Sequence, residues 1–384
     1  MGRPLSADAL IDAAMAATGL SDFGGDSFRE GLGILIADIN ADAVRPDDAI
    51  ERHAGMYTKI LMDRLKVIDA VKRRPEVLDA PIPRPVFIFG IPRTGTTLVN
   101  NLLAADPNRR SMLMWELNDP VPPPRADELF TDPRCLAQLE AEKAMLAANP
   151  AIGRIYRMSA VYPYECVSIM AHEFCTLMLE SAGKLPNYRD WFFSVDKTNA
   201  YEYHRKFLAL HQADAPGVWN LKMPSHALDI ETLLKVYPDA RLIWTHRDPY
   251  TATSSFCSII ASGHQNFAGR VDYEWIGKNV PWQAREHVDR VMDVRARIGH
   301  DRIIDSHYAE TLRDPIGSMR KLYAALGDEF TPEAEAGMRA WLADNPQGKF
   351  GKHEYKLAEY GLSKEKLDPL FERYLAEYDV EREG

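Results

Sequence analysis

One loop of the chain has the residue types and the spacing of a phosphate-binding turn. The stretch Phe89-Gly90-Ile91-Pro92-Arg93-Thr94-Gly95-Thr96-Thr97-Leu98 follows an apolar run and precedes a helical pattern. Gly90 and Gly95 have the spacing of the two glycines in G-x-x-x-x-G-K-[ST], and Thr97 has the position of the final hydroxyl residue. Such a turn aims backbone N–H groups and a helix N-terminus at an anion. Arg93 adds a guanidinium that suits phosphate-type oxygens.

The loop lacks the lysine that kinases and ATPases use. Thr96 stands at that position, whereas a nucleoside-triphosphate loop uses the lysine on the β- and γ-phosphates and the next hydroxyl on Mg²⁺. The apolar run 241–245 continues into His246-Arg247 before Asp248, so we find no clear acidic strand end for Mg²⁺. The pattern favours a phosphate-like ligand handled without metal over a plain tight turn between a strand and a helix.

Strands that alternate with helices must position this loop. The continuous apolar run 86–89 is typical of a buried parallel strand, and it leads through the loop into a helix over 96–105. Further strands are predicted at 218–221, 241–245 and 302–305, each followed by a helix, at 227–236, after Pro249 and at 315–326. This alternation predicts an α/β fold with a parallel sheet and helices on both faces.

The remaining segments predict helical additions to a single domain. Residues 1–80 carry apolar residues at helical spacing, in stretches such as 7–17 and 49–67, and show no strand pattern. The segments 134–149, 164–183 and 198–212 also look helical. We therefore expect a helical N-terminal extension over 1–80 and an α/β domain over 81–384, with a helical insertion at about 120–215.

The composition excludes several classes of protein. Of the 384 residues, 46% are hydrophobic and 10% aromatic, which is enough for a sizeable core and excludes a largely disordered chain. The 46 Lys and Arg residues against 56 Asp and Glu residues give a net charge of −10. An acidic chain without a long basic run lacks the electrostatic footprint of a nucleic-acid-binding protein. An anionic ligand must therefore be held by a local pocket.

The sequence shows neither a disulfide scaffold nor a membrane segment. The four cysteines are far apart and none forms a CxxC pair, so neither a zinc ribbon nor a redox dithiol is predicted. No apolar run approaches the roughly 20 residues that span a bilayer, and no signal segment opens the sequence. We expect a cytoplasmic protein without a transmembrane segment.

A second motif accompanies the loop. Pro92-Arg93-Thr94-Gly95-Thr96-Thr97 is similar to P-[RK]-[ST]-G-T-[TS], and Arg247 follows the strand 241–245, with Ser255 eight residues further on. Together these motifs resemble the 5′-phosphosulfate loop and the 3′-phosphate arginine and serine of sulfotransferases that use 3′-phosphoadenosine 5′-phosphosulfate (PAPS). The resemblance covers residues from about 85 to 327. It is strongest to the bacterial branch, through Trp219–His226, Val236–Arg241 and Tyr355…Tyr360-Gly361-Leu362.

The resemblance implies both a fold and a reaction. The implied fold is that of nucleotide kinases, a central parallel sheet flanked by helices with the loop after the first strand. The implied reaction moves a sulfuryl group from PAPS, as co-substrate, to a hydroxyl of a small-molecule or lipid-like acceptor, without a metal; an amine is the alternative acceptor group. Attacking and leaving atoms lie roughly in line, so the protein must hold the donor, stabilise negative charge and accept the acceptor's proton.

The resemblance also assigns donor-binding residues. It places Arg93, Thr94, Gly95, Thr96 and Thr97 at the 5′-phosphosulfate, Arg247 and Ser255 at the 3′-phosphate, and Tyr308 against the adenine. Tyr308 precedes Ala309-Glu310 where the family often reads Tyr-Glu-Asp, a departure that bears on the adenine contact. The late Gly/Lys loop Lys349–His353 is expected to be solvated rather than to close on the nucleotide.

Catalytic roles follow from the same resemblance. Lys222 ends a predicted strand, where ligands of open α/β sheets gather, and matches the family lysine at the bridging oxygen. For the general base, Glu116 and His226 are alternatives: the former follows the loop helix beside Trp115, and the latter comes soon after the lysine strand. His246 is expected to support the site from behind Arg247. For Glu165 the alternatives are lining the acceptor pocket and stabilising a helix N-terminus, where an acid is favourable, and the second is expected.

Two alternatives from other classes remain open in the sequence. One is a P-loop kinase or nucleotide hydrolase, against which Thr96 in the lysine position argues. The other is a non-catalytic nucleotide-binding module. Neither the acceptor nor the oligomeric state can be read from these patterns.

Overall fold

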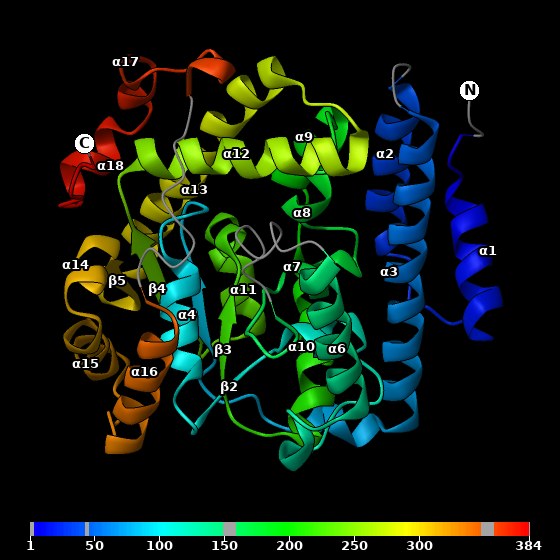
Figure 1. The fold of residues 1–384 in the computed structure, drawn as a ribbon, viewed down its shortest axis with the longest axis horizontal. Helices are drawn as coiled ribbons and strands as arrows, with labels where there is room; N and C mark the ends of the chain where they lie inside the picture. The colour runs from blue at the N-terminus through cyan, green and yellow to red at the C-terminus, as the bar shows by residue number, and fades with distance from the viewer. Residues whose placement is uncertain (1–3, 43–45, 149–158, 347–356, 384) are drawn as a thin grey trace.

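A parallel sheet forms the centre of the molecule. The computed structural model describes residues 4–42, 46–148, 159–346 and 357–383. Its five strands have the order β2-β3-β1-β4-β5, and every neighbouring pair is parallel (Figure 1). The strands are β1 (Val86–Phe89), β2 (Arg109–Ser111), β3 (Val218–Lys222), β4 (Arg241–His246) and β5 (Ile303–His307).

The α/β fold predicted from the sequence is confirmed. β1, β3 and β4 begin at the predicted residues, and β5 lies one to two residues later than expected. The edge strand β2 was not predicted, because Arg109-Arg110-Ser111 has no apolar alternation. It pairs with β3, with Ser111 opposite Asn220.

Helices cover both faces of the sheet. Val86 and Ile88 of β1 lie in one hydrophobic cluster, and Phe87 and Phe89 lie in another. This alternation buries the whole strand, as its continuous apolar sequence predicts. The first cluster is formed with α4 (Thr96–Ala104), α15 (Pro315–Leu326) and α16 (Pro332–Asp344).

The second face carries the larger core. It is covered by α10 (Thr198–Asp214), η4 (Pro224–Leu228), α11 (Ile230–Val236) and α13 (Tyr273–Ile298). The helix predicted over 227–236 is divided, because Asp229 leaves the helical backbone (φ −141°, ψ 38°) and its carboxylate accepts a hydrogen bond from Lys197 Nζ at 3.1 Å.

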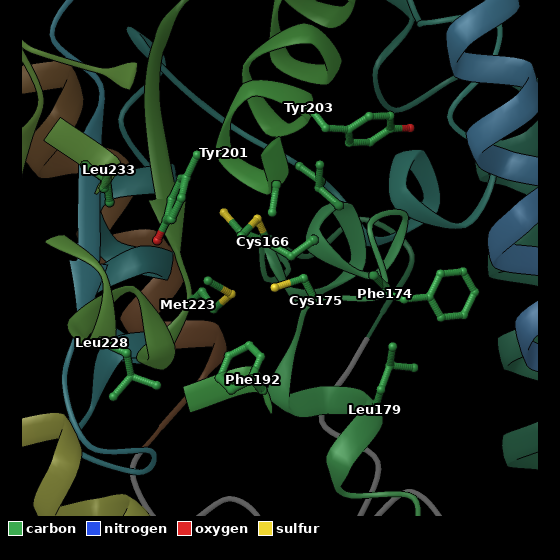
Figure 2. Close-up of a cluster of buried hydrophobic side chains, with 14 of the residues drawn as sticks. Cys166, Phe174, Cys175, Leu179, Phe192, Tyr201, Tyr203, Met223, Leu228 and Leu233 are labelled. Atoms are coloured by element: carbon green, nitrogen blue, oxygen red, sulfur yellow. The ribbon is translucent and has the colours of Figure 1, made fainter. Parts of the chain in front are cut away.

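Where the structure describes it, the insertion between β2 and β3 is built of helices. Its elements before α10 are α5 (Met114–Asn118), η2 (Ala126–Glu128), α6 (Pro133–Ala148), α7 (Val167–Ala171), α8 (Leu177–Glu180) and α9 (Pro186–Ser194). The helix predicted over 164–183 is interrupted, since Phe174 has a left-handed backbone (φ 48°) and Thr176 caps a new helix. Figure 2 shows Cys166, Cys175 and Met223 directing their sulfur atoms into the core here. These side chains therefore form part of the hydrophobic core.

The C-terminal elements complete the side of the sheet near β4 and β5. They are α12 (Pro249–Ala268), η5 (His300–Arg302), α14 (Tyr308–Arg313), η6 (Leu357–Tyr360), α17 (Lys364–Leu367), η7 (Asp368–Leu370) and α18 (Glu372–Glu377). α12 crosses the molecule above the sheet edge in Figure 1. Within the described ranges, no helix is both long and apolar enough to cross a membrane.

Residues 1–80 are helical where described and pack into the main core. The elements are α1 (Ala7–Thr18), α2 (Phe28–Ala41), α3 (Asp47–Arg73) and η1 (Pro75–Asp79). In Figure 1, α1, α2 and α3 stand together at one side of the molecule. Their buried side chains belong to the same cluster as the residues of β3 and β4. The helices predicted at 7–17 and 49–67 are confirmed, and the second is longer than predicted at both ends.

A buried arginine joins this N-terminal segment to the insertion. Arg64 of α3 donates to the carbonyls of Phe23 and His172, at 3.0 and 3.1 Å, and to Glu173 Oε1 at 2.5 Å. Ser27 donates to the other oxygen of Glu173 at 2.6 Å. The Arg64 guanidinium thus donates hydrogen bonds to acceptors in both the N-terminal segment and the insertion.

Removal of this arginine tests how tightly the N-terminal segment is integrated. Because Arg64→Ala would leave the Glu173 carboxylate buried without its cation, we expect a loss of about 3–5 kcal/mol in the free energy of unfolding. Urea denaturation measures it. Arg29→Ala is the control, since Arg29 forms an exposed ion pair with Asp26 on the same segment. Equal, small effects of both changes would contradict the structural role of Arg64.

Candidate active site

The predicted site residues gather where four strands end. The P-loop-like turn follows β1, Lys222 ends β3, Arg247 follows β4 and Tyr308 follows β5. The register aligns Ile88 with Lys222 and His246 with His307. Ligands of open parallel sheets bind beyond this carboxyl edge, so the topology brings residues from distant parts of the sequence to one place.

The turn after β1 depends on its two glycines. Gly90 has φ 152°, and a Cβ there would lie 2.7 Å from the carbonyl oxygen of Thr245. Gly95 has φ 95°, and its Cβ would lie 2.5 Å from Tyr308 Cδ2. Gly95 is also the N-cap of α4, and no side chain caps that helix. The N-terminus of α4 is thus presented as an anion site, with positive dipole potential.

The threonines of the turn divide into two roles. Thr94 is buried, and both its N–H and its hydroxyl donate to the Ile91 carbonyl, at 3.3 and 2.7 Å. Its hydroxyl also contacts Thr245 Oγ1 at 2.6 Å. Thr94 therefore holds the turn together rather than offering its hydroxyl to a ligand, which refines its predicted role. Thr96 is buried at the start of α4, and Thr97 is exposed.

Arg93 connects the two predicted anion-binding motifs. Its backbone is left-handed (φ 77°), and its Nε donates to Ser255 Oγ of α12 at 3.0 Å. The carbonyl of Arg93 accepts from Arg247 Nη1 at 3.0 Å. The Arg93 side chain thus lies with Arg247 and Ser255, on the side predicted for the 3′-phosphate rather than for the 5′-phosphosulfate.

Tyr308 lies beneath the guanidinium of Arg247. The Arg247 guanidinium stands over the Tyr308 ring, 4.4 Å from its centroid, a cation–π contact. The same ring occupies the space that a side chain at position 95 would need. Tyr308 therefore positions Arg247 against the turn, and the predicted contact with adenine stays a prediction.

Lys222 bridges the turn and the insertion. Its Nζ donates to Thr97 Oγ1 at 3.4 Å and forms an ion pair with Glu165. The side chain of Lys222 is 4% exposed, whereas that of Glu165 is 28% exposed. The N–H of Cys166 donates to the Lys222 carbonyl at 2.9 Å, which fixes Glu165 beside the end of β3.

The two side chains predicted as alternative bases are enclosed. Both oxygens of Glu116 pair with Arg110, and one also accepts the N–H of Leu113 at 2.9 Å. His226 Nδ1 contacts the Tyr201 hydroxyl at 2.9 Å, and burial lowers the pKa of His226 well below its ordinary value. Both side chains are fully buried. The structure thus gives Glu116 and His226 core partners and does not present either one to an acceptor.

His246 is buried at the end of β4, next to Arg247 in the chain, and its supporting role in the site stays a prediction. Its ring nitrogens contact the Tyr374 hydroxyl and Asp305 Oδ1, each at 2.9 Å. Burial lowers its pKa to about 4, against the opposite effect of Asp305. The Gly/Lys loop Lys349–His353 lies outside the described residues.

Sequence reasoning undervalued Glu165 as a partner of Lys222. The two residues are 57 positions apart, so no local spacing links them. The one available signal was the acid at the start of a helix, which has an ordinary explanation in the helix dipole. In the part of the chain that is described, no group of three or more His, Cys, Asp or Glu side chains is arranged to hold a metal ion.

Comparisons with known proteins agree with this geometry. A family model described as the sulfotransferase family matches residues 85–332. The omega-hydroxy-beta-dihydromenaquinone-9 sulfotransferase Stf3 of Mycobacterium bovis is 20% identical over 346 residues, which cover 83% of this chain and 80% of the relative.

Solved structures give the same answer over nearly the whole chain. Sulfotransferase STF9 from Mycobacterium avium has a TM-score of 0.92 and 41% identity, and the match covers 99% of this chain and 98% of that one. Sulfotransferase STF1 from Mycobacterium tuberculosis has a TM-score of 0.86 and 28% identity, covering 97% and 99%. The chain therefore belongs to the sulfotransferase family, and it is an enzyme that transfers sulfuryl groups.

Proposed function

We propose that this site transfers the sulfuryl group of PAPS to a hydroxyl of a small-molecule or lipid-like acceptor. The observation that carries the proposal is the pair of anion sites joined at Arg93. One is the uncapped N-terminus of α4, and the other is formed by Arg247 and Ser255. A donor with phosphate groups at both the 5′ and 3′ positions matches this pair, whereas AMP or ATP would leave the second site unused.

The residues present fit such a donor. The N–H groups at the start of α4 and the hydroxyls of Thr96 and Thr97 suit the 5′-phosphosulfate, because donors at a helix N-terminus bind anions. Arg247, with its planar fork, suits the 3′-phosphate. The space at Gly95 is bounded by Tyr308, so the turn cannot accept a larger residue without moving the ring below Arg247.

Lys222 is the residue placed to stabilise charge during transfer. Its ammonium group lies between Thr97 at the turn and Glu165. Negative charge grows on the bridging oxygen as the bond to sulfur breaks, and a fixed cation at this point stabilises it. Because the side chain is almost completely buried, its charge is screened little by water.

We assign the general base to Glu165 rather than to Glu116 or His226. Glu165 is partly exposed and lies across Lys222 from the turn, so an acceptor hydroxyl entering the site can reach its carboxylate. A general base must lie within hydrogen-bond reach of the proton that it accepts, and the Glu165 carboxylate is held beside Lys222 where an acceptor can approach it. Glu116 and His226 would first have to break their core contacts.

Two exposed apolar side chains that are close in the sequence to site residues agree with an acceptor that has a lipid-like part. Tyr162, 38% exposed, precedes Glu165 by three residues. Ile259, 45% exposed, lies one turn after Ser255 on the same face of α12. Stf3, the curated relative, is named for a menaquinone derivative with a terminal hydroxyl, which agrees with an acceptor of this class.

Nucleotide selectivity tests the donor site. We expect 3′-phosphoadenosine 5′-phosphate (PAP) to raise the melting temperature more than AMP or ATP with Mg²⁺, since a ligand that binds only the folded state stabilises it by mass action. Arg247→Ala should weaken PAP binding roughly ten- to hundredfold, the range for a lost charge-assisted hydrogen bond, and leave AMP almost unchanged. Stabilisation by ATP with Mg²⁺ and not by PAP would contradict the proposal and favour a kinase.

Replacement of the carboxylate tests the base. We expect Glu165→Gln to lower the single-turnover rate of sulfuryl transfer about 10²- to 10⁴-fold, the range for general base catalysis, with PAP affinity nearly retained. Glu116→Gln is the matched control: it breaks the pair with Arg110 and should lower the melting temperature without a comparable loss of rate. A large loss of rate in Glu116→Gln or His226→Asn, with Glu165→Gln active, would overturn the assignment.

A further inference from the structure

A carboxylate from the C-terminal segment lies on the arginine predicted for the 3′-phosphate. Arg247 Nε donates to Glu383 Oε1 at 2.5 Å, and Arg247 Nη2 donates to Glu383 Oε2 at 2.8 Å. Two parallel bonds of this kind are the geometry in which an arginine binds either a carboxylate or a phosphate. Glu383 thus presents to Arg247 the same pattern of acceptors as a phosphate group.

The backbone of this segment is held at the same site. The N–H of Glu383 donates to Asp248 Oδ2 at 3.0 Å, and Arg382 Nε lies 3.1 Å from Asp248 Oδ1. Asp248 follows Arg247 directly in the chain and caps α12. Val380, Glu381 and Glu383 line one cavity together with Arg247 and Tyr308. The segment therefore forms a wall of the predicted 3′-phosphate site.

The segment is tethered close to the arginine. The Tyr374 hydroxyl contacts His246 Nδ1 at 2.9 Å, and the Tyr378 ring stacks on His246 with centroids 4.9 Å apart. Both tyrosines are buried, so the chain is anchored to β4 five residues before Glu383. A short tether keeps the effective concentration of a binding group high. Glu383 is therefore always available to the Arg247 site.

A more highly charged anion can displace Glu383 from its ion pair with Arg247. The side chain of Glu383 is 38% exposed and that of Arg247 is 16% exposed, so the ion pair is partly hydrated and weak. A phosphate group carries more charge than a carboxylate and has three acceptor oxygens. The carboxylate and the phosphate cannot use the same Nε and Nη2 donors at once.

We propose that Glu383 is an internal competitor for the 3′-phosphate of the donor, so that the donor binds by displacing residues 379–383 from Arg247. This inference rests on the proposed function, because it takes Arg247 as the 3′-phosphate site. The apparent affinity for the donor is then lowered by the fraction of molecules in which Glu383 covers Arg247. A nucleotide without a 3′-phosphate does not compete with Glu383.

Two charge-matched variants test the competition. Calorimetric titration of the full chain with PAP should show an affinity roughly three- to tenfold higher in Glu383→Gln than in the wild type, since a partly exposed ion pair competes only weakly. AMP should bind both proteins equally. Glu372→Gln is the control, because Glu372 is an exposed residue of α18 in the same C-terminal part of the chain and lies outside the lining of this cavity. Both substitutions change the net charge equally.

Hydrogen exchange gives a second measurement that does not depend on activity. PAP should speed exchange at residues 379–383 of the wild type, whereas AMP should not. If PAP binds the wild type through Arg247 but Glu383→Gln and Glu372→Gln bind it equally well, or exchange at 379–383 slows, the competition is overturned and the proposed function stands. If none of the three proteins binds PAP, the proposed function fails and this inference with it.

Discussion

The site depends on the backbone of Arg93. Its left-handed conformation (φ 77°) is unfavourable for a residue with a side chain, and it persists because both ends of the residue are held. The carbonyl accepts from Arg247 and the side chain donates to Ser255. One residue therefore fixes the distance between the helix N-terminus that follows β1 and the arginine that follows β4. A donor with two anionic groups can be recognised only if that distance is constant.

The burial of charged side chains distinguishes two fully enclosed ion pairs from the two pairs to which we assign functional roles. Arg64 with Glu173 and Arg110 with Glu116 are ion pairs in which both side chains are enclosed. Breaking such a pair leaves a charge without compensation, so these groups are suited to holding elements together. Lys222 with Glu165 and Arg247 with Glu383 each combine an enclosed cation with a partly exposed carboxylate. Only pairs of this second kind can exchange a partner for a ligand or a proton.

The sequence could predict the elements that carry strong local patterns. The apolar runs of β1 and β4, the glycine-bounded turn and the spacing of Arg247 and Ser255 are local features, and each lies where it was expected. The division of 164–183 into two helices depends on the backbone of Phe174, and a single residue in a left-handed conformation leaves no periodic signal. β2 was missed because its three residues are polar and pair only along one edge.

The base that we propose, Glu165, is harder to predict from the sequence than the proposed donor site, for a physical reason. A phosphate site is built from backbone N–H groups and from residues fixed by a turn, so its spacing in the sequence is short and specific. A general base is recognised by the exposure of its side chain and by the residue that it contacts. Both depend on the tertiary structure rather than on neighbouring residues in the sequence. Glu116 has the expected position after α4. Its carboxylate points into the core, because it pairs with Arg110 of β2. Glu165 acquires its place only when the insertion folds back onto β3.

In an acidic chain, a strong anion site must also be prevented from binding anions indiscriminately. The net charge of −10 repels anionic ligands at long range, and at short range the cations Lys222 and Arg247 already have carboxylate partners. In the competition proposed above, donor binding at Arg247 exchanges one anion, the Glu383 carboxylate, for another. A ligand with a single phosphate gains little binding free energy from such an exchange. A ligand with two anionic groups gains binding free energy at both the turn and Arg247. Because Arg93 holds these two sites at a fixed distance, the site we propose selects a donor whose two anionic groups have the matching separation.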